Sequence, residues 1–251
     1  MRPTLVFQAQ RIEPADFEQR VLRSAAALQA AGVASGDVVA LLLRNCPEAI
    51  ELMLAVRHLG AQWCPVNWHF KTDEVQYILG NSGAKVLIAD ADLLAALPGL
   101  EPGAAQVWSV RGRVHDLPAW EPLREATAPI STPPAPPRGA MFYTSGTTGR
   151  PKGIVREPMT QAQVVANVHM RRQAYGAEPG MRALLSAPWY HSAPNSYALG
   201  IAQDQGTLFV EERFDAERTL QLIQEHRLTH AYLVPTMYVR LLALPATVRA
   251  K

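Results

Sequence analysis

Residues 37–43 read Asp-Val-Val-Ala-Leu-Leu-Leu and follow a Ser-Gly turn. The stretch is short, apolar and partly β-branched, which is typical of a strand buried on both faces of a parallel sheet. Apolar spacing predicts a helix on each side of it, over residues 15–31 and 47–59. Gly32 and Gly60 follow these helices, and glycine often ends a helix because it tolerates left-handed backbone angles. The order helix, strand, helix indicates the start of an α/β pattern.

The same alternation continues to the end of the chain. A helix is predicted over residues 72–81, with Thr72 as its cap because a threonine hydroxyl can accept a hydrogen bond from a free backbone N–H. Further strands are predicted at 84–89, 140–143, 183–187, 207–211 and 230–234, and further helices at 160–175, 193–203, 215–226 and 236–244. Strands that alternate with helices indicate an α/β fold with mostly parallel sheets flanked by helices.

One proline-rich segment interrupts this pattern. Residues 128–138 read Ala-Pro-Ile-Ser-Thr-Pro-Pro-Ala-Pro-Pro-Arg, a composition that excludes a helix interior or a central strand. We expect residues 129–138 to form an extended surface linker. It would separate a first α/β block at 1–128 from a second block at 139–251.

The composition indicates a globular chain without strong charge. Its 251 residues are 48% hydrophobic, and 24 basic and 22 acidic residues are mixed along the sequence. A formal charge of +2 builds no extended field, so no nucleic-acid partner is expected. The first apolar run is too short for a secretory signal, and the longest is far below the roughly 20 residues that cross a bilayer. No export and no membrane span are predicted; oligomeric state cannot be predicted.

The two cysteines, Cys46 and Cys64, are too few for a disulfide framework. Their spacing to His58 and His69 matches no common zinc site. Free cysteine usually behaves as a small buried apolar residue. We therefore expect two buried or partly buried reduced thiols, which favours a cytoplasmic location.

The segment with the clearest chemistry is residues 143–153, Tyr-Thr-Ser-Gly-Thr-Thr-Gly-Arg-Pro-Lys-Gly. Residues 144–149 place four hydroxyl side chains and two glycines directly after a predicted strand. Glycine lets backbone N–H groups approach phosphate oxygens, hydroxyls add donors, and Lys152 adds a positive charge. The spacing is not that of a Walker loop, so a P-loop kinase or GTPase is not expected. Taken alone, the segment could also be a turn whose hydroxyls bond their own backbone.

The eleven residues 143–153 closely resemble the AMP-binding signature of the superfamily of acyl-CoA synthetases, firefly luciferase and peptide-synthetase adenylation domains. Residues 45–90, 188–195 and 234–237 also look like parts of that family's N-terminal domain. The resemblance therefore covers roughly residues 15–251. It implies a partial N-terminal domain of the acyl-CoA synthetase/luciferase fold and an ATP-dependent, AMP-forming acid–CoA ligase.

The resemblance also implies roles for particular residues. The carboxylic acid, ATP and CoA would be the small-molecule partners, with Mg²⁺ beside the phosphates. Thr144 would also touch the metal, Lys152 would support the phosphates, His191 would orient the acid's carboxylate, and Trp189 would wall the acyl entrance. The ATP-binding residues would be Thr144, Ser145, Gly146, Thr147, Thr148, Gly149 and Lys152, with Lys152 and His191 as catalytic residues.

Several family segments do not occur in the 251 residues: the Tyr-Gly-x-Thr-Glu motif, the Thr-Gly-Asp ribose-binding stretch and the C-terminal subdomain with its lysine. The resemblance thus implies the front portion of such an enzyme, which we expect not to turn over alone; whether it catalyses the adenylation step by itself stays open. Two alternatives stay open, an adenylating enzyme that uses a carrier protein or an oxidative step, and a non-catalytic nucleotide-binding fragment. Ala193, Ser196 and Leu199 are candidate acyl-pocket residues, and a fatty acid is the expected substrate.

Overall fold

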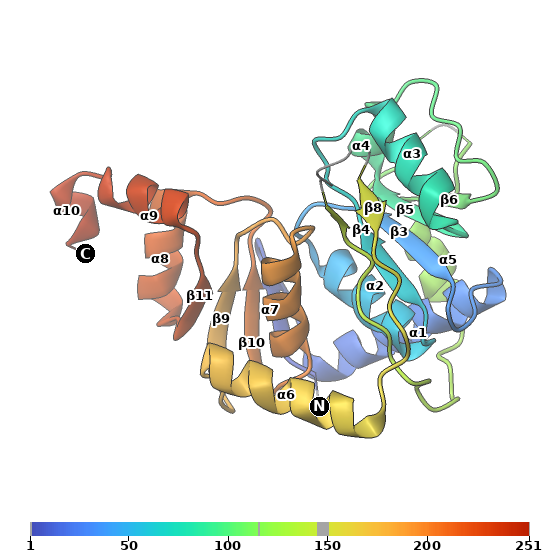
Figure 1. The fold of residues 1–251 in the computed structure, drawn as a ribbon. Helices are drawn as coiled ribbons and strands as arrows, with labels where there is room; N and C mark the ends of the chain where they lie inside the picture. The colour runs from blue at the N-terminus through green and yellow to red at the C-terminus, as the bar shows by residue number, and fades with distance from the viewer. Residues whose placement is uncertain (1, 115, 145–150, 251) are drawn as a thin grey trace. The chain divides into compact units, whose positions relative to one another are not determined.

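The computed structural model describes residues 2–114, 116–144 and 151–250. Its contacts divide the chain into two compact units (Figure 1). Unit 1 comprises the start of the chain through Phe17, Arg44–Pro47, and the region from Asn167 onward. Unit 2 comprises Glu18–Leu43 and Glu48–Ala166. Both units are discontinuous in sequence, so they do not coincide with the blocks predicted at 1–128 and 139–251, which stay a prediction.

Unit 1 contains a five-stranded sheet in the order β11-β9-β10-β1-β2. The strands are β1 Thr4–Phe7, β2 Gln10–Ile12, β9 Met181–Leu185, β10 Gly206–Val210 and β11 His230–Tyr232. β1 pairs with β10 in parallel, β10 and β11 each pair with β9 in parallel, and β2 runs antiparallel to β1. The first residues of the chain thus pair with a strand about two hundred residues later in the sequence.

Helices pack against this sheet and against each other. They are α6 Gln161–Tyr175, which begins in unit 2, α7 Ser192–Ala202, α8 Ala216–His226, α9 Pro235–Leu242 and α10 Ala246–Arg249. α7 lies along β9 and β10 (Figure 1). α8 packs on the sheet through Leu222, which contacts Leu184 of β9 and Phe209 of β10. The burial of such side chains holds α8 to the sheet.

Unit 2 contains a parallel four-stranded sheet in the order β4-β3-β5-β6. The strands are β3 Val38–Leu42, β4 Gln62–Pro65, β5 Val86–Asp90 and β6 Gln106–Val110. The accompanying helices are α1 Pro14–Ala30, whose first turn lies in unit 1, α2 Pro47–His58, α3 Thr72–Ser82, α4 Ala91–Ala95 and α5 Trp120–Ala126. Every residue of β3 is buried, as the apolar run predicted. The predicted α/β class with mostly parallel sheets is confirmed.

A buried carboxylate ties three helices of unit 2 together. Glu51 of α2 is fully buried and accepts hydrogen bonds from Arg20 Nε at 2.7 Å and Arg124 Nη1 at 3.0 Å. Ser24 of α1 also donates to Glu51, and Arg20 reaches Glu48 at 2.7 Å. Burying charge is costly unless it is paired and hydrogen-bonded. The network meets that condition by joining α1, α2 and α5.

Two local predictions were wrong. Thr72 does not cap α3: it is the first helical residue, and its hydroxyl donates to the Pro98 carbonyl at 3.2 Å. The helix start is satisfied instead by Glu74, whose side chain accepts from the Lys71 N–H at 2.8 Å. The strand predicted at 140–143 begins only at its last residue, because β7 covers Tyr143–Thr144.

Residues 129–138 contain neither helix nor strand and are exposed or partly buried. They are nevertheless tied to unit 2, since the Ala135 N–H donates to the His58 carbonyl at 2.9 Å. The absence of helix and strand agrees with the high proline content. Its predicted role as a boundary between blocks stays a prediction.

Candidate functional site

A short hairpin in unit 2 frames the predicted phosphate-binding segment. β7 Tyr143–Thr144 pairs antiparallel with β8 Lys152–Gly153, and Thr144 lies opposite Lys152. Lys152, whose side chain is exposed, therefore stands where the segment's two ends meet. The predicted residues Ser145, Gly146, Thr147, Thr148 and Gly149 lie outside the described residues, and for Thr144 the description covers the main chain alone.

The segments on either side of this hairpin, residues 137–142 and 154–159, are also hydrogen-bonded to each other. Arg138 Nη1 donates to the Arg156 carbonyl at 2.7 Å, and the Met159 N–H donates to the Pro137 carbonyl at 2.9 Å. These bonds fix the direction in which both segments approach the hairpin. The end of the proline-rich segment is thus part of the support of the site.

Two tyrosines attach the hairpin to α3. The Tyr77 hydroxyl donates to the Pro151 carbonyl at 2.8 Å, and the Tyr143 hydroxyl donates to Asn81 Oδ1 at 2.8 Å. The two rings meet edge to face with centroids 6.4 Å apart, an arrangement that aromatic pairs favour. Burial raises the pKa of Tyr143 to about 12, so its hydroxyl keeps its proton at neutral pH. Both ends of the predicted loop are anchored to α3.

Gly153 is required by packing against Tyr143. A Cβ atom at residue 153 would lie 2.8 Å from Tyr143 Cζ and 2.9 Å from Cε2, closer than carbon atoms tolerate. In the sequence, Gly153 is recognisable only as the last residue of the motif at 143–153. The structure supplies the reason, because the absent side chain lets the anchoring tyrosine cross the hairpin.

His191 stands in unit 1 at the start of α7. It is the residue before the helix, with φ −78° and ψ 148°, and its carbonyl accepts from the Asn195 N–H at 3.0 Å. Its own N–H donates to the Pro188 carbonyl at 3.2 Å, which closes a tight turn after β9. The imidazole is exposed and lies 4.4 Å from the Tyr190 ring, measured between centroids. Partial loss of solvent lowers its pKa from the ordinary value of 6.5.

Trp189, predicted to wall the acyl entrance, is fully buried. Both of its backbone polar groups are hydrogen-bonded to asparagine side chains: its N–H donates to Asn45 Oδ1 at 2.9 Å, and its carbonyl accepts from Asn195 Nδ2 at 3.1 Å. No role was predicted for either asparagine from the sequence. Asn45 could be found only through structure, because 144 positions separate it from Trp189.

The three candidate acyl-pocket residues lie on α7 and differ in exposure. Ala193 is exposed, Leu199 is buried, and Ser196 is partly buried with its hydroxyl 3.2 Å from the Tyr175 hydroxyl that donates to it. Their role in substrate binding stays a prediction.

The structure thus groups the predicted residues by unit. Thr144 and Lys152 belong to unit 2, and Trp189 and His191 belong to unit 1. Among the described residues, no three side chains of His, Cys, Asp or Glu are grouped as a metal site. The Mg²⁺ contact predicted for Thr144 stays a prediction.

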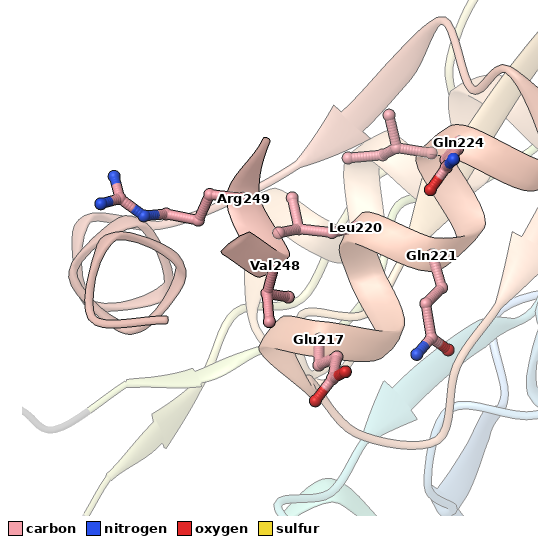
Figure 2. A pocket seen from close by; sticks show the side chains of 7 residues that line it. Glu217, Leu220, Gln221, Gln224, Val248 and Arg249 are labelled. Atoms are coloured by element: carbon pink, nitrogen blue, oxygen red, sulfur yellow. The ribbon is translucent and has the colours of Figure 1, made fainter. Parts of the chain in front are cut away.

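A groove of about 340 Å³ lies elsewhere in unit 1, between α8 and α10 (Figure 2). Figure 2 shows Glu217 and Leu220 of α8 lining it together with Val248 of α10. It contains none of the predicted site residues.

The sequence profile of the family described as AMP-binding enzyme matches residues 1–251. The chain belongs to this family. The family resemblance that residues 143–153 suggested is therefore confirmed over the length of the chain.

Several curated relatives of this chain are CoA ligases. It is 33% identical over 240 residues to a feruloyl-CoA synthase of Amycolatopsis sp, covering 92% of this chain and 45% of the relative. It is 32% identical over 224 residues to a long-chain-fatty-acid–CoA ligase of Mycobacterium tuberculosis, covering 86% of this chain and 42% of the relative. The chain spans less than half the length of these relatives.

Solved structures agree with this family assignment. A Mycobacterium tuberculosis fatty acyl CoA synthetase superposes with a TM-score of 0.79 at 26% identity, covering 98% of this chain and 49% of that one. ATP-bound MatB from Rhodopseudomonas palustris superposes with a TM-score of 0.78 at 25% identity, covering 99% and 50%. Within the described part of the chain, no helix is long and apolar enough to cross a membrane.

Proposed function

We propose that this chain carries the ATP-binding front of an acyl-CoA synthetase. The enzyme activates a carboxylic acid, with a fatty acid as the proposed substrate, through an acyl-adenylate and transfers the acyl group to CoA. The observation that supports this most is the hairpin of residues 143–153, which pairs Thr144 with Lys152 across the two ends of the family signature. A cation at the mouth of a loop rich in hydroxyls and glycines suits a polyphosphate.

In the proposed first step, a carboxylate oxygen bonds to the α-phosphorus of ATP. The bond between the α-phosphorus and its bridging oxygen breaks, and pyrophosphate leaves. Both reactants are anionic, so positioning and charge neutralisation dominate the barrier. Lys152 and residues 144–149 would hold the phosphates, and Thr144 would also hold Mg²⁺, which would supply positive charge beside them.

His191 is proposed to orient the attacking carboxylate. Its lowered pKa favours the neutral imidazole near pH 7. The ring would then donate one N–H hydrogen bond to the carboxylate and would not form an ion pair with it. In the second step the CoA thiol attacks the acyl carbonyl, its proton passes to solvent, and AMP leaves. No residue of the chain needs to act as a covalent nucleophile. Trp189 belongs to this proposal as the wall of the acyl entrance.

The fatty-acid substrate and the cytoplasmic location are the finer parts of the proposal. Relatives bear the names of ligases for long-chain fatty acids, ferulate, indoleacetate and sulfoacetate, so the acid has to be determined by assay. The proposed location rests on Cys46 and Cys64, whose side chains are both buried. Reduced thiols of this kind are usual inside cells.

Acid-dependent exchange between pyrophosphate and ATP tests the first step. We expect exchange with one class among short, medium and long fatty acids and benzoate-type acids. Lys152→Ala should lower it about 100-fold, the scale for losing one charge-stabilising donor, whereas Lys71→Ala, at another exposed lysine of unit 2, should not. Equal activity of both variants would contradict the assigned site.

Two other functions remain distinguishable by assay. A nonribosomal peptide synthetase of Salinispora arenicola is 30% identical over 235 residues, which favours testing a carrier-protein thiol as acceptor beside CoA. If the folded chain binds ATP but supports no exchange with any acid, a non-catalytic nucleotide-binding fragment is the better description.

A further inference from the structure

Asn45 connects three backbone groups at the carboxyl end of the sheet in unit 1. The side chain is fully buried. Its Nδ2 donates to the Ala187 carbonyl at 2.9 Å and to the Glu211 carbonyl at 3.1 Å. Its Oδ1 accepts from the Trp189 N–H at 2.9 Å. One amide group thereby bonds to the segments that follow β9 and β10.

The chemistry of this position requires an amide. Two carbonyl oxygens face the donor side and one N–H faces the acceptor side, so both Nδ2 hydrogens and Oδ1 are used. A carboxylate would meet two carbonyl oxygens without a proton to offer. An apolar side chain would leave three buried backbone groups unpaired, each at a cost.

The groups that Asn45 holds lie just before His191. Asn195 of α7 donates to the Trp189 carbonyl, in the next peptide group, and the His191 N–H donates to the Pro188 carbonyl, which closes the turn. The imidazole itself makes no hydrogen bond with another described side chain or backbone group. The backbone of the turn, to which Asn45 is hydrogen-bonded, therefore sets the position from which the imidazole extends.

We propose that Asn45 is a positioning residue of the adenylation step, which fixes the Trp189–His191 turn and with it the direction of the His191 imidazole. The effect on the reaction rests on the function proposed above. The effect on the turn does not, because it concerns hydrogen bonds within unit 1. The two can be measured separately on the whole 251-residue chain.

The test compares Asn45→Ala with Leu222→Ala, a control that removes a buried side chain of the same unit without touching the turn. Both variants lose stability. We expect only Asn45→Ala to speed hydrogen exchange of the Trp189 amide, by about tenfold relative to the control, the scale of one lost hydrogen bond. The NMR titration midpoint of His191 should also move toward its ordinary value.

The kinetic arm measures pyrophosphate–ATP exchange at a temperature where both variants are folded. We expect Asn45→Ala to lower kcat about tenfold below Leu222→Ala, with an unchanged KM for ATP. Asn45→Asp supplies a variant that keeps the acceptor for Trp189. Its activity should recover as the pH falls, because protonation of the introduced carboxyl returns one donor, and Leu222→Ala should show no such recovery.

Equal Trp189 exchange and equal His191 midpoints in Asn45→Ala and Leu222→Ala would overturn the proposal. If Asn45→Ala does not fold, Asn45→Asp decides through the same two readouts, compared at high and low pH. A wild-type chain without any acid-dependent exchange would contradict the proposed function, while the amide and histidine measurements would still decide the role of Asn45.

Discussion

His191 is the residue whose titration is most informative. Loss of solvent lowers the pKa of the folded imidazole below 6.5, so the unfolded chain takes up the proton first as the pH falls. The stability that the neutral ring contributes is present above about pH 6.5 and is lost as the pH falls through the folded pKa. We expect an NMR midpoint below that of a histidine peptide. A midpoint at or above 6.5 would contradict this prediction.

Gly153 gives a second prediction at the residue scale. Gly153→Ala forces a methyl group against the Tyr143 ring, and overpacking of this kind costs about 1–3 kcal/mol. Gly80→Ala is the matched control, since a methyl group inside α3 meets nothing within 4 Å and should stabilise the helix by up to about 1 kcal/mol. Urea denaturation measures both free energies of unfolding. Opposite signs are expected for the two variants.

At the scale of helices, Glu51 should dominate the assembly of α1, α2 and α5. Glu51→Ala leaves Arg20 and Arg124 without their buried partner, and breaking a buried pair in this way typically costs about 3–5 kcal/mol. Glu125→Ala removes an exposed carboxylate that also pairs with Arg124, at 3.3 Å. Exposed pairs contribute at most about 1 kcal/mol, so thermal unfolding should separate the two variants clearly. Similar losses would mean that the network contributes little.

The elements that the sequence predicted well are those with a strong local signal. β3 is a continuous apolar run, and α1 and α8 carry apolar residues at helical spacing, so their bounds agree within one or two residues. β1 and β2 are only four and three residues long and were not predicted. β1 pairs with β10, about two hundred residues later in the sequence, and β2 pairs with β1, so their strand conformation depends on tertiary context. The cap of α3 was misassigned because Glu74 satisfies the helix start that Thr72 was expected to satisfy.

At the scale of the whole chain, some residues of the candidate site can be found from a sequence motif, and others only from the folded structure. The signature at 143–153 and the segment around His191 are contiguous, so both were found from sequence. Tyr77 and Asn45 were not, since each bonds to a backbone group 74 or 144 positions away. Side chains that support a site through the main chain leave no local pattern, because the atoms they contact are the same in every residue.

The two compact units each contain one buried thiol, with Cys46 in unit 1 and Cys64 in unit 2. Burial raises the pKa of Cys64 to about 12, so it cannot react until its surroundings open. In Cys64→Ser only the thiol of unit 1 remains, and in Cys46→Ser only the thiol of unit 2 remains. The rate of thiol labelling in mild denaturant therefore reports the opening of one unit in each variant. Two different labelling rates would mean that the chain opens in two independent steps, and one common rate would mean that both units open in a single cooperative transition.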